Sequence, residues 1–387
     1  MSISPAKYLF ASNARHMITG YGNQTNLFAP MIKRSGREIA IFAFYGQEGA
    51  PTVDQDGILT LPRMEQEFGN DIVLGHYQYV KADVVLSLID PRELDPEVYA
   101  QMNWCAWSPI DSTPASPANL SSLQAARWIW VLSKFGQAQL QAANLNSTYV
   151  PHGVDVDLFR PIDRAAARHT LSEALRVDLD GKFIVMVNAA NRDSPSRKGF
   201  YETFAAFKLF AESHPDALLY MHTRQQNFGR GEDLAQVAAL VGLDPTKIIY
   251  APQYALKAGF LTPDYLNAAY NACDVLFSTS HAEGFGLPLI EAQAAGCPVV
   301  VTDSSAMSEL VFAGKKIRAM AYMPQVGYTW QRPIVEEAAD QLSWAYENWH
   351  NEGLRAQARD GALAYDYRVV FSTYMLPALE QIEAELA

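Results

Sequence analysis

The sequence predicts an α/β protein built from two doubly wound domains, each with a parallel β-sheet. Short apolar runs alternate with amphipathic stretches along the 387 residues. The apolar runs are continuous rather than alternating in polarity, which is typical of strands covered by helices on both faces. The pattern lapses after about residue 160 and then restarts, and a chain of this length is long enough for two domains.

The first domain is expected over residues 1–165. Five apolar runs predict its strands, and the amphipathic stretches between them predict helices. The expected strands are Tyr8–Ala11, Ile39–Phe44, Val84–Ile89, Cys105–Trp107 and Trp130–Ser133. The expected helices include Thr25–Arg34 and Leu120–Arg127.

The second domain is expected over residues 166–365, after a linker at Arg160–Val177. The expected strands are Phe183–Asn188, Leu218–His222, Ile248–Ala251, Val275–Ser278 and Val299–Thr302. The expected helices include Phe200–Ser213, Leu234–Val241 and Pro263–Ala272, the last with a good N-cap at Thr262. A final helix within 366–387 has no strand after it. In such folds a ligand binds at the carboxyl ends of the strands, here in a cleft between the domains.

The composition is that of a soluble globular protein with 49% hydrophobic and 19% charged residues. The formal net charge of −12 does not predict a nucleic-acid surface, which needs clustered Lys and Arg. No apolar run approaches the roughly 20 residues that span a bilayer, and the N-terminus does not resemble a signal peptide, so the cytoplasm is the expected location. Nothing in the sequence predicts the oligomeric state.

The segment Ser280–Ser304 is the most informative part of the chain. Glu283 and Glu291 flank the turn Gly284-Phe285-Gly286-Leu287-Pro288, between two apolar runs. The pattern predicts a strand, a loop, a helix and a second strand. The loop before Pro288 can offer backbone N–H groups to an anion, helped by the helix dipole. Glu291 can accept hydrogen bonds from hydroxyls, as acids do for a ribose. A phosphate site with hydroxyl acceptors beside it suits a nucleotide-sugar.

A basic loop follows the first strand of the second domain. It contains Asn191, Arg192 and Lys198 and leads into the helix expected after Gly199. Two cations at a strand's carboxyl end can neutralise a diphosphate without a metal. The alternative is a solvated loop that is merely basic. Asn191 is expected to contact the same donor.

The first domain has its own glycine loop, with Gly20 and Gly22 between the first strand and the first helix. Glycine allows a backbone to approach a ligand closely, although any strand–helix turn can carry one.

Further candidates in the first domain are Asp90, Asp111 and His152. Either acid could bind a sugar hydroxyl or accept a proton from an acceptor, and loop capping is the alternative, favoured for Asp90. His152 is either a ligand contact or a cap that buttresses the hinge. Four tryptophans in or near strands are either a stacking wall for a sugar or core residues, and core is the commoner role.

No metal site and no cofactor are predicted. The Asp-x-Asp pairs at Asp155/Asp157 and Asp178/Asp180 lie in turns near the linker. The three cysteines are far apart in apolar surroundings and are expected to be reduced.

Together, Glu283-x7-Glu291 with its Gly-Phe-Gly-Leu-Pro turn, Arg192…Lys198-Gly199, and the segment Pro151–Asp155 resemble the retaining nucleotide-sugar glycosyltransferases of the GT-B fold, family four, also called glycosyl transferases group 1. The resemblance is strongest from Pro151 to about Leu310.

The resemblance implies a role for each matched residue. Arg192 and Lys198 would hold the diphosphate, and Glu291 would bind the ribose. Glu283, with the backbone of Phe285, Gly286 and Leu287, would hold the donor sugar. Gly20 and Gly22 would approach the phosphates and the acceptor, and the last helix would cross back onto the first domain. One departure stands out: Asp111 lies about where the family carries a His.

The expected function is metal-independent, retaining transfer of a hexose from a nucleoside-diphosphate sugar to an acceptor hydroxyl. The base, the sugar and the acceptor are not predicted. The alternative is a nucleotide-sugar-binding protein or an inactive partner subunit, which the missing His motivates. An epimerase or a phosphorylase on the same fold is disfavoured, because neither is expected to carry these motifs together.

Overall fold

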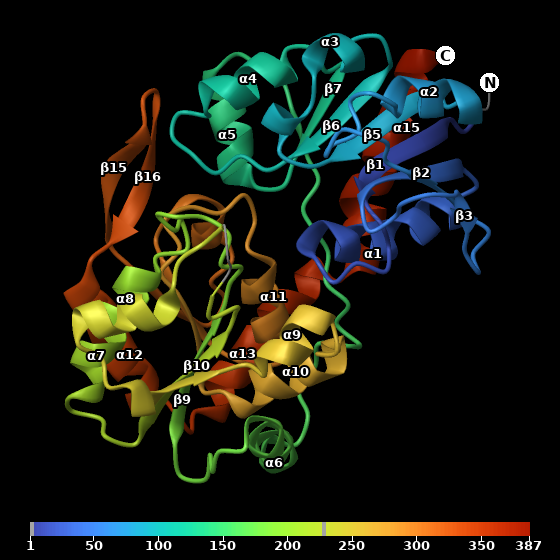
Figure 1. Ribbon diagram of the computed structural model, residues 1–387. Helices are drawn as coiled ribbons and strands as arrows, with labels where there is room; N and C mark the ends of the chain where they lie inside the picture. The colour runs from blue at the N-terminus through green and yellow to red at the C-terminus, as the bar shows by residue number, and fades with distance from the viewer. Residues whose placement is uncertain (1–3, 227–229) are drawn as a thin grey trace. The chain divides into compact units, whose positions relative to one another are not determined.

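The computed structural model describes residues 4–226 and 230–387 (Figure 1). Its internal contacts divide the chain into two compact units. Unit 1 comprises Met1–Gly153, Gln325–Tyr328 and Tyr365–Ala387, and unit 2 comprises Val154–Pro324 and Thr329–Ala364. Each unit contains one main sheet with parallel strands. Two parallel-sheet α/β domains are the architecture that the sequence predicts.

The sheet of unit 1 has the order β3-β4-β2-β1-β5-β6-β7-β8. Its strands run parallel except β3, which pairs antiparallel with β4. The strands are β1 (Lys7–Asn13), β2 (Glu38–Tyr45), β3 (Thr52–Val53), β4 (Leu59–Pro62), β5 (Val84–Leu88), β6 (Trp104–Ser108), β7 (Trp128–Val131) and β8 (Thr148–Tyr149). The central strands are apolar throughout because helices cover both faces.

The helices of unit 1 begin at side-chain caps. Thr19, Ser116 and Ser133 accept hydrogen bonds from the first turns of α1, α4 and α5, which satisfies N–H groups that have no partner inside the helix. The helices before the unit boundary are α1 (Gly20–Arg34), α2 (Val73–Val80), α3 (Pro96–Tyr99), α4 (Pro117–Leu123) and α5 (Lys134–Ala142).

The tryptophans of unit 1 belong to its core. Trp104, Trp107 and Trp130 are fully buried, and Trp128 nearly so. The indole N–H of Trp107 donates to the Val150 carbonyl (2.7 Å), and that of Trp104 donates to Ser87 Oγ (2.8 Å). The core interpretation is therefore confirmed, and the stacking wall is wrong.

The C-terminal residues pack on unit 1 through a buried ion pair. Arg37, at the start of β2, lies with Nη2 2.7 Å and Nε 2.8 Å from the two carboxylate oxygens of Glu383. The backbone N–H of Ala6 donates to the same carboxylate (3.0 Å). Glu383 belongs to α15 (Leu376–Leu386), which follows α14 (Tyr367–Val370) and a π-helical turn at Phe371–Met375.

The sheet of unit 2 has the order β11-β10-β9-β12-β13-β14, all parallel. Its strands are β9 (Phe183–Asn188), β10 (Ala217–His222), β11 (Ile248–Tyr250), β12 (Val275–Ser278), β13 (Val299–Thr302) and β14 (Gly314–Ile317). The expected bounds of β9, β12 and β13 are confirmed to the residue. A separate antiparallel hairpin, β15 (Ala319–Gln325) with β16 (Tyr328–Pro333), follows β14 and was not predicted.

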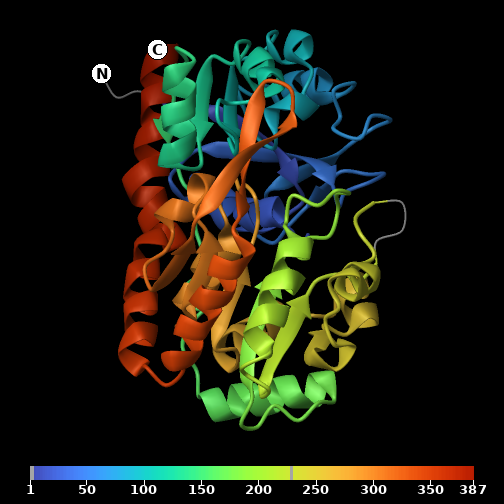
Figure 2. The same cartoon turned by 90° about the vertical axis from the view of Figure 1, so that its left-hand side faces the viewer.

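Helices cover both faces of the second sheet, as two views of the ribbon show (Figures 1 and 2). On one face α7, α8 and α12 enclose an apolar core with alternate strand residues such as Phe183 and Val185. The helices of unit 2 are α6 (Arg164–Leu175), α7 (Phe200–Ala211), α8 (Leu234–Val241), α9 (Gln253–Ala258), α10 (Pro263–Ala272), α11 (Leu287–Ala294), α12 (Val335–Glu347) and α13 (Glu352–Ala362).

The expected linker at Arg160–Val177 is wrong. Helix α6 occupies most of this segment, and the contact-based boundary falls earlier, between Gly153 and Val154. Asp163 caps the helix, and Arg168 makes two hydrogen bonds to the buried carboxylate of Asp274. The helix has only two buried residues, Ala167 and Leu171, so its apolar pattern is weak in the sequence.

Candidate functional site

The order of strands in unit 2 brings two loops together. Strand β9 lies between β10 and β12, so the chain leaves β9 in one direction and β12 in the other. In open α/β sheets, ligands bind at this point, outside the carboxyl ends of the strands. The loop after β9 carries Lys198, and the loop after β12 carries Glu283.

A glycine allows the two loops to touch. Gly199 has φ +66°, and a Cβ there would lie 2.2 Å from the Thr279 carbonyl oxygen. Thr279 Oγ1 in turn donates to the Gly199 carbonyl (2.7 Å). Any larger residue would separate the loops, so glycine at this position is a structural requirement of the site.

Glu283 is held by two cations at this junction. Its Oε1 pairs with Lys198 Nζ, and its Oε2 lies 3.1 Å from Arg197 Nη1. Arg197 also donates to the Ala282 carbonyl. Burial alone would raise the pKa of the Glu283 carboxyl, but Arg197 and Lys198 outweigh burial and lower the pKa to about 2. The group is therefore an anion throughout the neutral range.

Arg197 is a site residue that the sequence analysis missed. Three cations lie in this loop, and residue order alone does not say which side chains turn toward the β12 loop. Arg192 is exposed, and among the described residues no hydrogen bond or ion pair involves its side chain. Adjacency to Lys198 was the only available signal for Arg197.

Asn191 supports the loop with its side chain. Its Nδ2 donates to the carbonyls of Arg224 (3.1 Å) and Glu232 (2.7 Å), and its Oδ1 accepts from Glu232 N (2.8 Å). The Asn191 amide therefore ties the loop after β9 to the segment after β10. Its expected contact with a donor stays a prediction.

Glu291 lies on α11, 6% exposed, in a different environment. Tyr270 Oη donates to Glu291 Oε2 (2.9 Å), and Asn188 Nδ2 donates to Tyr270 Oη (2.7 Å). Burial raises the pKa of Glu291 to about 7, against the opposing effect of Tyr270.

The turn before α11 contains a glycine whose backbone dihedral angle φ is positive. Gly286 has φ +114° and is the N-cap residue, and α11 begins at Leu287. An L-residue rarely adopts this angle, so glycine is needed here. Phe285 is buried, which anchors the turn between Glu283 and Glu291.

The glycine loop of unit 1 is a tight helix entry. Thr19 Oγ1 accepts from Gly22 N (3.0 Å) and from Asn13 Nδ2 (2.8 Å). A Cβ on Gly22 would lie 2.2 Å from the Met17 carbonyl oxygen, so the chain itself requires this glycine. Gly20 is the exposed first residue of α1.

The two first-domain acids lie close enough to interact. Asp90 caps a 3₁₀ turn, and its Oδ2 lies 3.0 Å from Arg92 Nη2. Burial raises the pKa of Asp90 to about 6, and the negative charge of Asp111 adds to the rise, against Arg92. The geometry of Asp90 therefore agrees with the loop-capping interpretation.

His152 is buried in unit 1, with its ring centroid 5.2 Å from that of Trp107 in an edge-on arrangement. Burial lowers its pKa to about 3, so the imidazole is neutral. This environment matches the packing interpretation better than a charged ligand contact.

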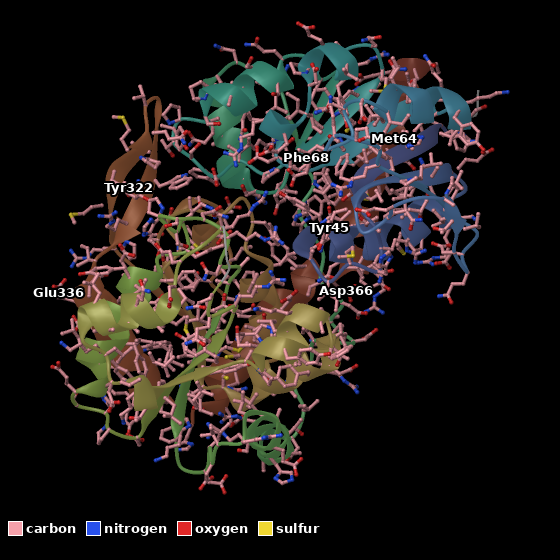
Figure 3. The ribbon with its side chains drawn as sticks, viewed as in Figure 1. Tyr45, Met64, Phe68, Tyr322, Glu336 and Asp366 are labelled. Carbon is pink, nitrogen blue, oxygen red and sulfur yellow. The ribbon has the colours of Figure 1, made fainter. Side chains whose placement is uncertain are left out.

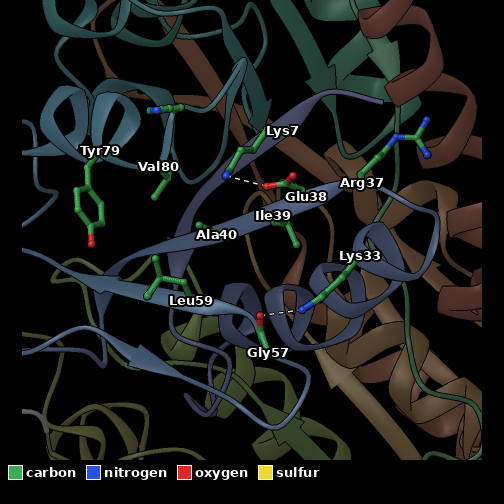
Figure 4. A pocket seen from close by; sticks show the side chains of 11 residues that line it. Lys7, Lys33, Arg37, Glu38, Ile39, Ala40, Gly57, Leu59, Tyr79 and Val80 are labelled. Atoms are coloured by element: carbon green, nitrogen blue, oxygen red, sulfur yellow. Dashed lines mark hydrogen bonds and ion pairs between the residues drawn. The ribbon is translucent and has the colours of Figure 1, made fainter. Parts of the chain in front are cut away.

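A cavity of about 530 Å³ opens at the amino ends of β1 and β2 (Figure 4). It therefore lies at the edge of the unit 1 sheet that is opposite to the carboxyl ends of the strands. Its cations are largely engaged with the protein. Lys7 pairs with Glu38 (2.7 Å), and Lys33 donates to the carbonyls of Asp56 and Gly57. We assign no ligand to this cavity.

Within residues 4–226 and 230–387, no group of three or more His, Cys, Asp or Glu side chains could hold a metal ion. No helix in the same ranges is both long and apolar enough to cross a membrane.

The fold has close relatives among solved structures. Sucrose-phosphate synthase from Thermosynechococcus elongatus aligns with a TM-score of 0.76 and 16% identity, over 99% of this chain and 100% of that one. Anabaena HepE, solved in complex with UDP and glucose, aligns with a TM-score of 0.70 and 17% identity, over 97% of this chain and 100% of that one. At these identities the likeness shows the fold, which is GT-B.

Sequence comparison adds a family match for part of the chain. Residues 256–362 match the model of the family described as glycosyl transferases group 1. D-inositol 3-phosphate glycosyltransferase from Nocardia farcinica is 32% identical over 168 residues, which cover 43% of this chain and 34% of that protein. The match spans about a third of the length of such curated relatives.

Proposed function

We propose that the protein is a metal-independent, retaining glycosyltransferase that moves a hexose from a nucleoside-diphosphate sugar to an acceptor hydroxyl. The observation that carries the proposal is Glu283, a partly buried carboxylate that Lys198 and Arg197 keep ionised at the topological switch point of unit 2. An ionised carboxylate accepts hydrogen bonds from sugar hydroxyls without a proton of its own to compete.

The proposed roles follow the motif. Arg192 and Lys198 neutralise the diphosphate, and Glu291 accepts from the ribose hydroxyls. The backbone around Phe285, Gly286 and Leu287 holds the sugar together with Glu283. In unit 1, Gly20 and Gly22 approach the phosphates, and Asp111 contacts the acceptor.

In the proposed reaction the bond between the anomeric carbon and the diphosphate oxygen breaks, and the acceptor oxygen bonds to the same face of that carbon. The leaving phosphate oxygen takes the acceptor proton. Negative charge grows on the diphosphate in the transition state, and Arg192 and Lys198 stabilise it in place of a metal. Arg192→Ala should lower turnover by roughly two to three orders of magnitude, as loss of an oxyanion donor does.

The comparisons suggest where to begin. HepE was solved with UDP and glucose, so UDP-glucose is the first donor to test. D-inositol 3-phosphate glycosyltransferases are among the relatives, so an inositol phosphate is the first acceptor. The alternative is a nucleotide-sugar-binding protein without transfer activity, which Asp111 in place of the family His favours.

Thermal shift with UDP, GDP, ADP and their sugars, each with and without EDTA, tests the proposal. A ligand at a hundred times its dissociation constant should stabilise the protein by about 2.7 kcal/mol. Stabilisation by one nucleotide regardless of EDTA, lost in Arg192→Ala and Glu291→Ala, supports the assignment. Donor binding without transfer or slow donor hydrolysis would favour the binding protein, and no binding would overturn both.

A further inference from the structure

A polar cluster lies beside the Glu283 loop and has no role in the proposed chemistry; two of its members are buried, Tyr322 is half-buried and the Arg332 side chain is 55% exposed. It comprises Glu202 on α7, His281 after β12, Tyr322 on β15 and Arg332 on β16. His281 is 4% and Glu202 6% exposed. All four residues belong to unit 2, and Tyr322 is labelled on the hairpin in Figure 3. Buried polar groups of this kind are normally retained for a structural or functional reason.

The imidazole of His281 lies between two partners. Its Nδ1 is 2.6 Å from Tyr322 Oη, and its Nε2 is 3.3 Å from Glu202 Oε2, at ion-pair distance. Arg332 closes the group, with Nε 3.3 Å from Glu202 Oε1 and its guanidinium 4.7 Å from the Tyr322 ring centroid. Burial alone would raise the pKa of Glu202, but His281 and Arg332 lower it.

The backbone of His281 is held as firmly as its ring. Its N–H donates to the Arg197 carbonyl (2.8 Å). Its carbonyl accepts from Gln331 N (3.1 Å) on β16 and from Ser304 Oγ (2.7 Å) after β13. His281 therefore joins the hairpin, the end of β13 and the loop after β9 at one point, two residues before Glu283.

We propose that Tyr322, His281 and Glu202 are positioning residues that hold Glu283 where it meets the hydroxyls of a donor sugar. The inference rests on the proposed function of Glu283. The three side chains act through the loop, because the ring of His281 orients the backbone that continues to Ala282 and Glu283. The hairpin β15–β16 thereby becomes a support of the sugar subsite.

The proposal separates two kinds of binding. Glu291 has its own support from Tyr270 on α10, so loss of the Tyr322 hydroxyl should leave binding of a sugar-free nucleoside diphosphate unchanged. Binding and turnover of the nucleotide-sugar should fall about tenfold, which is the effect of one lost hydrogen bond near 1.4 kcal/mol.

The test uses the full chain and the variants Tyr322→Phe, His281→Leu and His281→Gln. Tyr346→Phe is the matched control, because its hydroxyl donates from α12 to Asp216 (3.0 Å) and, within the described residues, makes no hydrogen bond to the Glu283 loop. Amide hydrogen exchange of residues 279–286 should quicken in Tyr322→Phe and His281→Leu, not in Tyr346→Phe, and His281→Gln should restore part of the protection.

The binding and exchange measurements distinguish failure of the positioning role from failure of the proposed function. Unchanged exchange at 279–286 in Tyr322→Phe and His281→Leu overturns the positioning role, whatever the protein catalyses. Equal losses for UDP and UDP-glucose in Tyr322→Phe also overturn it, because they indicate general destabilisation. If the wild type binds no nucleotide-sugar while exchange still responds, the proposed function fails and the loop support stands.

Discussion

Glu291 is buried in unit 2 and Glu283 is largely so, yet their pKa values move in opposite directions. Glu283 has two cations at its carboxylate, which lower its pKa to about 2 despite burial. Glu291 has a tyrosine hydroxyl instead of a cation, and burial raises its pKa to about 7. Only the second residue changes its charge near neutral pH, so pH separates the two proposed roles.

Nucleotide-sugar binding should strengthen as pH rises through 7. Ribose hydroxyls bind the ionised form of Glu291, which is the minor form below its pKa. We expect affinity about tenfold higher at pH 8 than at pH 6, measured by calorimetry. A nucleotide-sugar is the right probe because its phosphates carry no group that titrates near pH 6, as a terminal phosphate does. Glu291→Gln should bind weakly and without this pH dependence, and a wild type as flat as the variant would remove Glu291 from the ribose site.

The stability of the free protein should change with pH in the opposite direction, falling where the affinity for the nucleotide-sugar rises. A carboxyl whose folded pKa is raised contributes stability below its unfolded value of 4.5, and this stability is lost as pH rises through 7. Glu291→Gln should therefore gain about 2–3 kcal/mol relative to wild type between pH 5 and pH 8, measured by urea denaturation. Glu173→Gln, with a side chain 71% exposed, is the control and should show no such gain.

Prediction at the residue scale found both acids and the cation Lys198, which pairs with Glu283, but missed Arg197. Glu283 and Glu291 stand in a motif whose turn glycines and spacing can be recognised in the sequence. Arg197 was missed because its direction depends on Gly199, whose positive φ presses the loop against Thr279. That contact depends on the order of strands β10, β9 and β12, which is a property of the folded sheet.

At the scale of elements, prediction succeeded where burial was complete. The strand Phe183–Asn188 is a continuous apolar run and was assigned to the residue. The hairpin Ala319–Pro333 was missed because many of its side chains are exposed and it contains Pro324. Helix α6 was missed because it buries two residues and is anchored by charges instead. The spacing of apolar residues in a sequence indicates which faces of an element are buried, but it does not indicate which ion pairs anchor the element.

The anchor of α6 can be tested on the helix itself. Arg168 donates to both carboxylate oxygens of Asp274, which is fully buried and also accepts from Ile184 N. Arg168→Met should destabilise the protein by about 3 kcal/mol in urea, because removing one partner leaves a buried charge undercompensated. His169→Gln changes the next residue, whose side chain is 75% exposed, and should cost less than about 0.5 kcal/mol. Equal effects of the two variants would mean that the buried pair is not the anchor.

At the scale of the whole molecule, unit 1 combines the chain up to Gly153 with the chain from Tyr365 onward, and with the short segment Gln325–Tyr328. Unit 1 therefore needs both ends of the chain, and Glu383 closes it by pairing with Arg37. The charged residues proposed to bind the nucleotide, Arg192, Lys198 and Glu291, lie in unit 2, and unit 1 is proposed to add only Gly20 and Gly22. Stability of unit 1 and donor binding by unit 2 should thus be separable by mutation.

Differential scanning calorimetry should show two unfolding transitions, one for each unit. Glu383→Gln should lower one transition, by about 3–5 kcal/mol of stability, because it leaves Arg37 buried beside a neutral amide. A bound nucleotide should raise mainly the other transition, by an amount that grows with ligand concentration. Glu380→Gln, exposed on the same helix, is the control and should move neither. If ligand and Glu383→Gln shift one shared transition to similar extents, the two units unfold as one cooperative body.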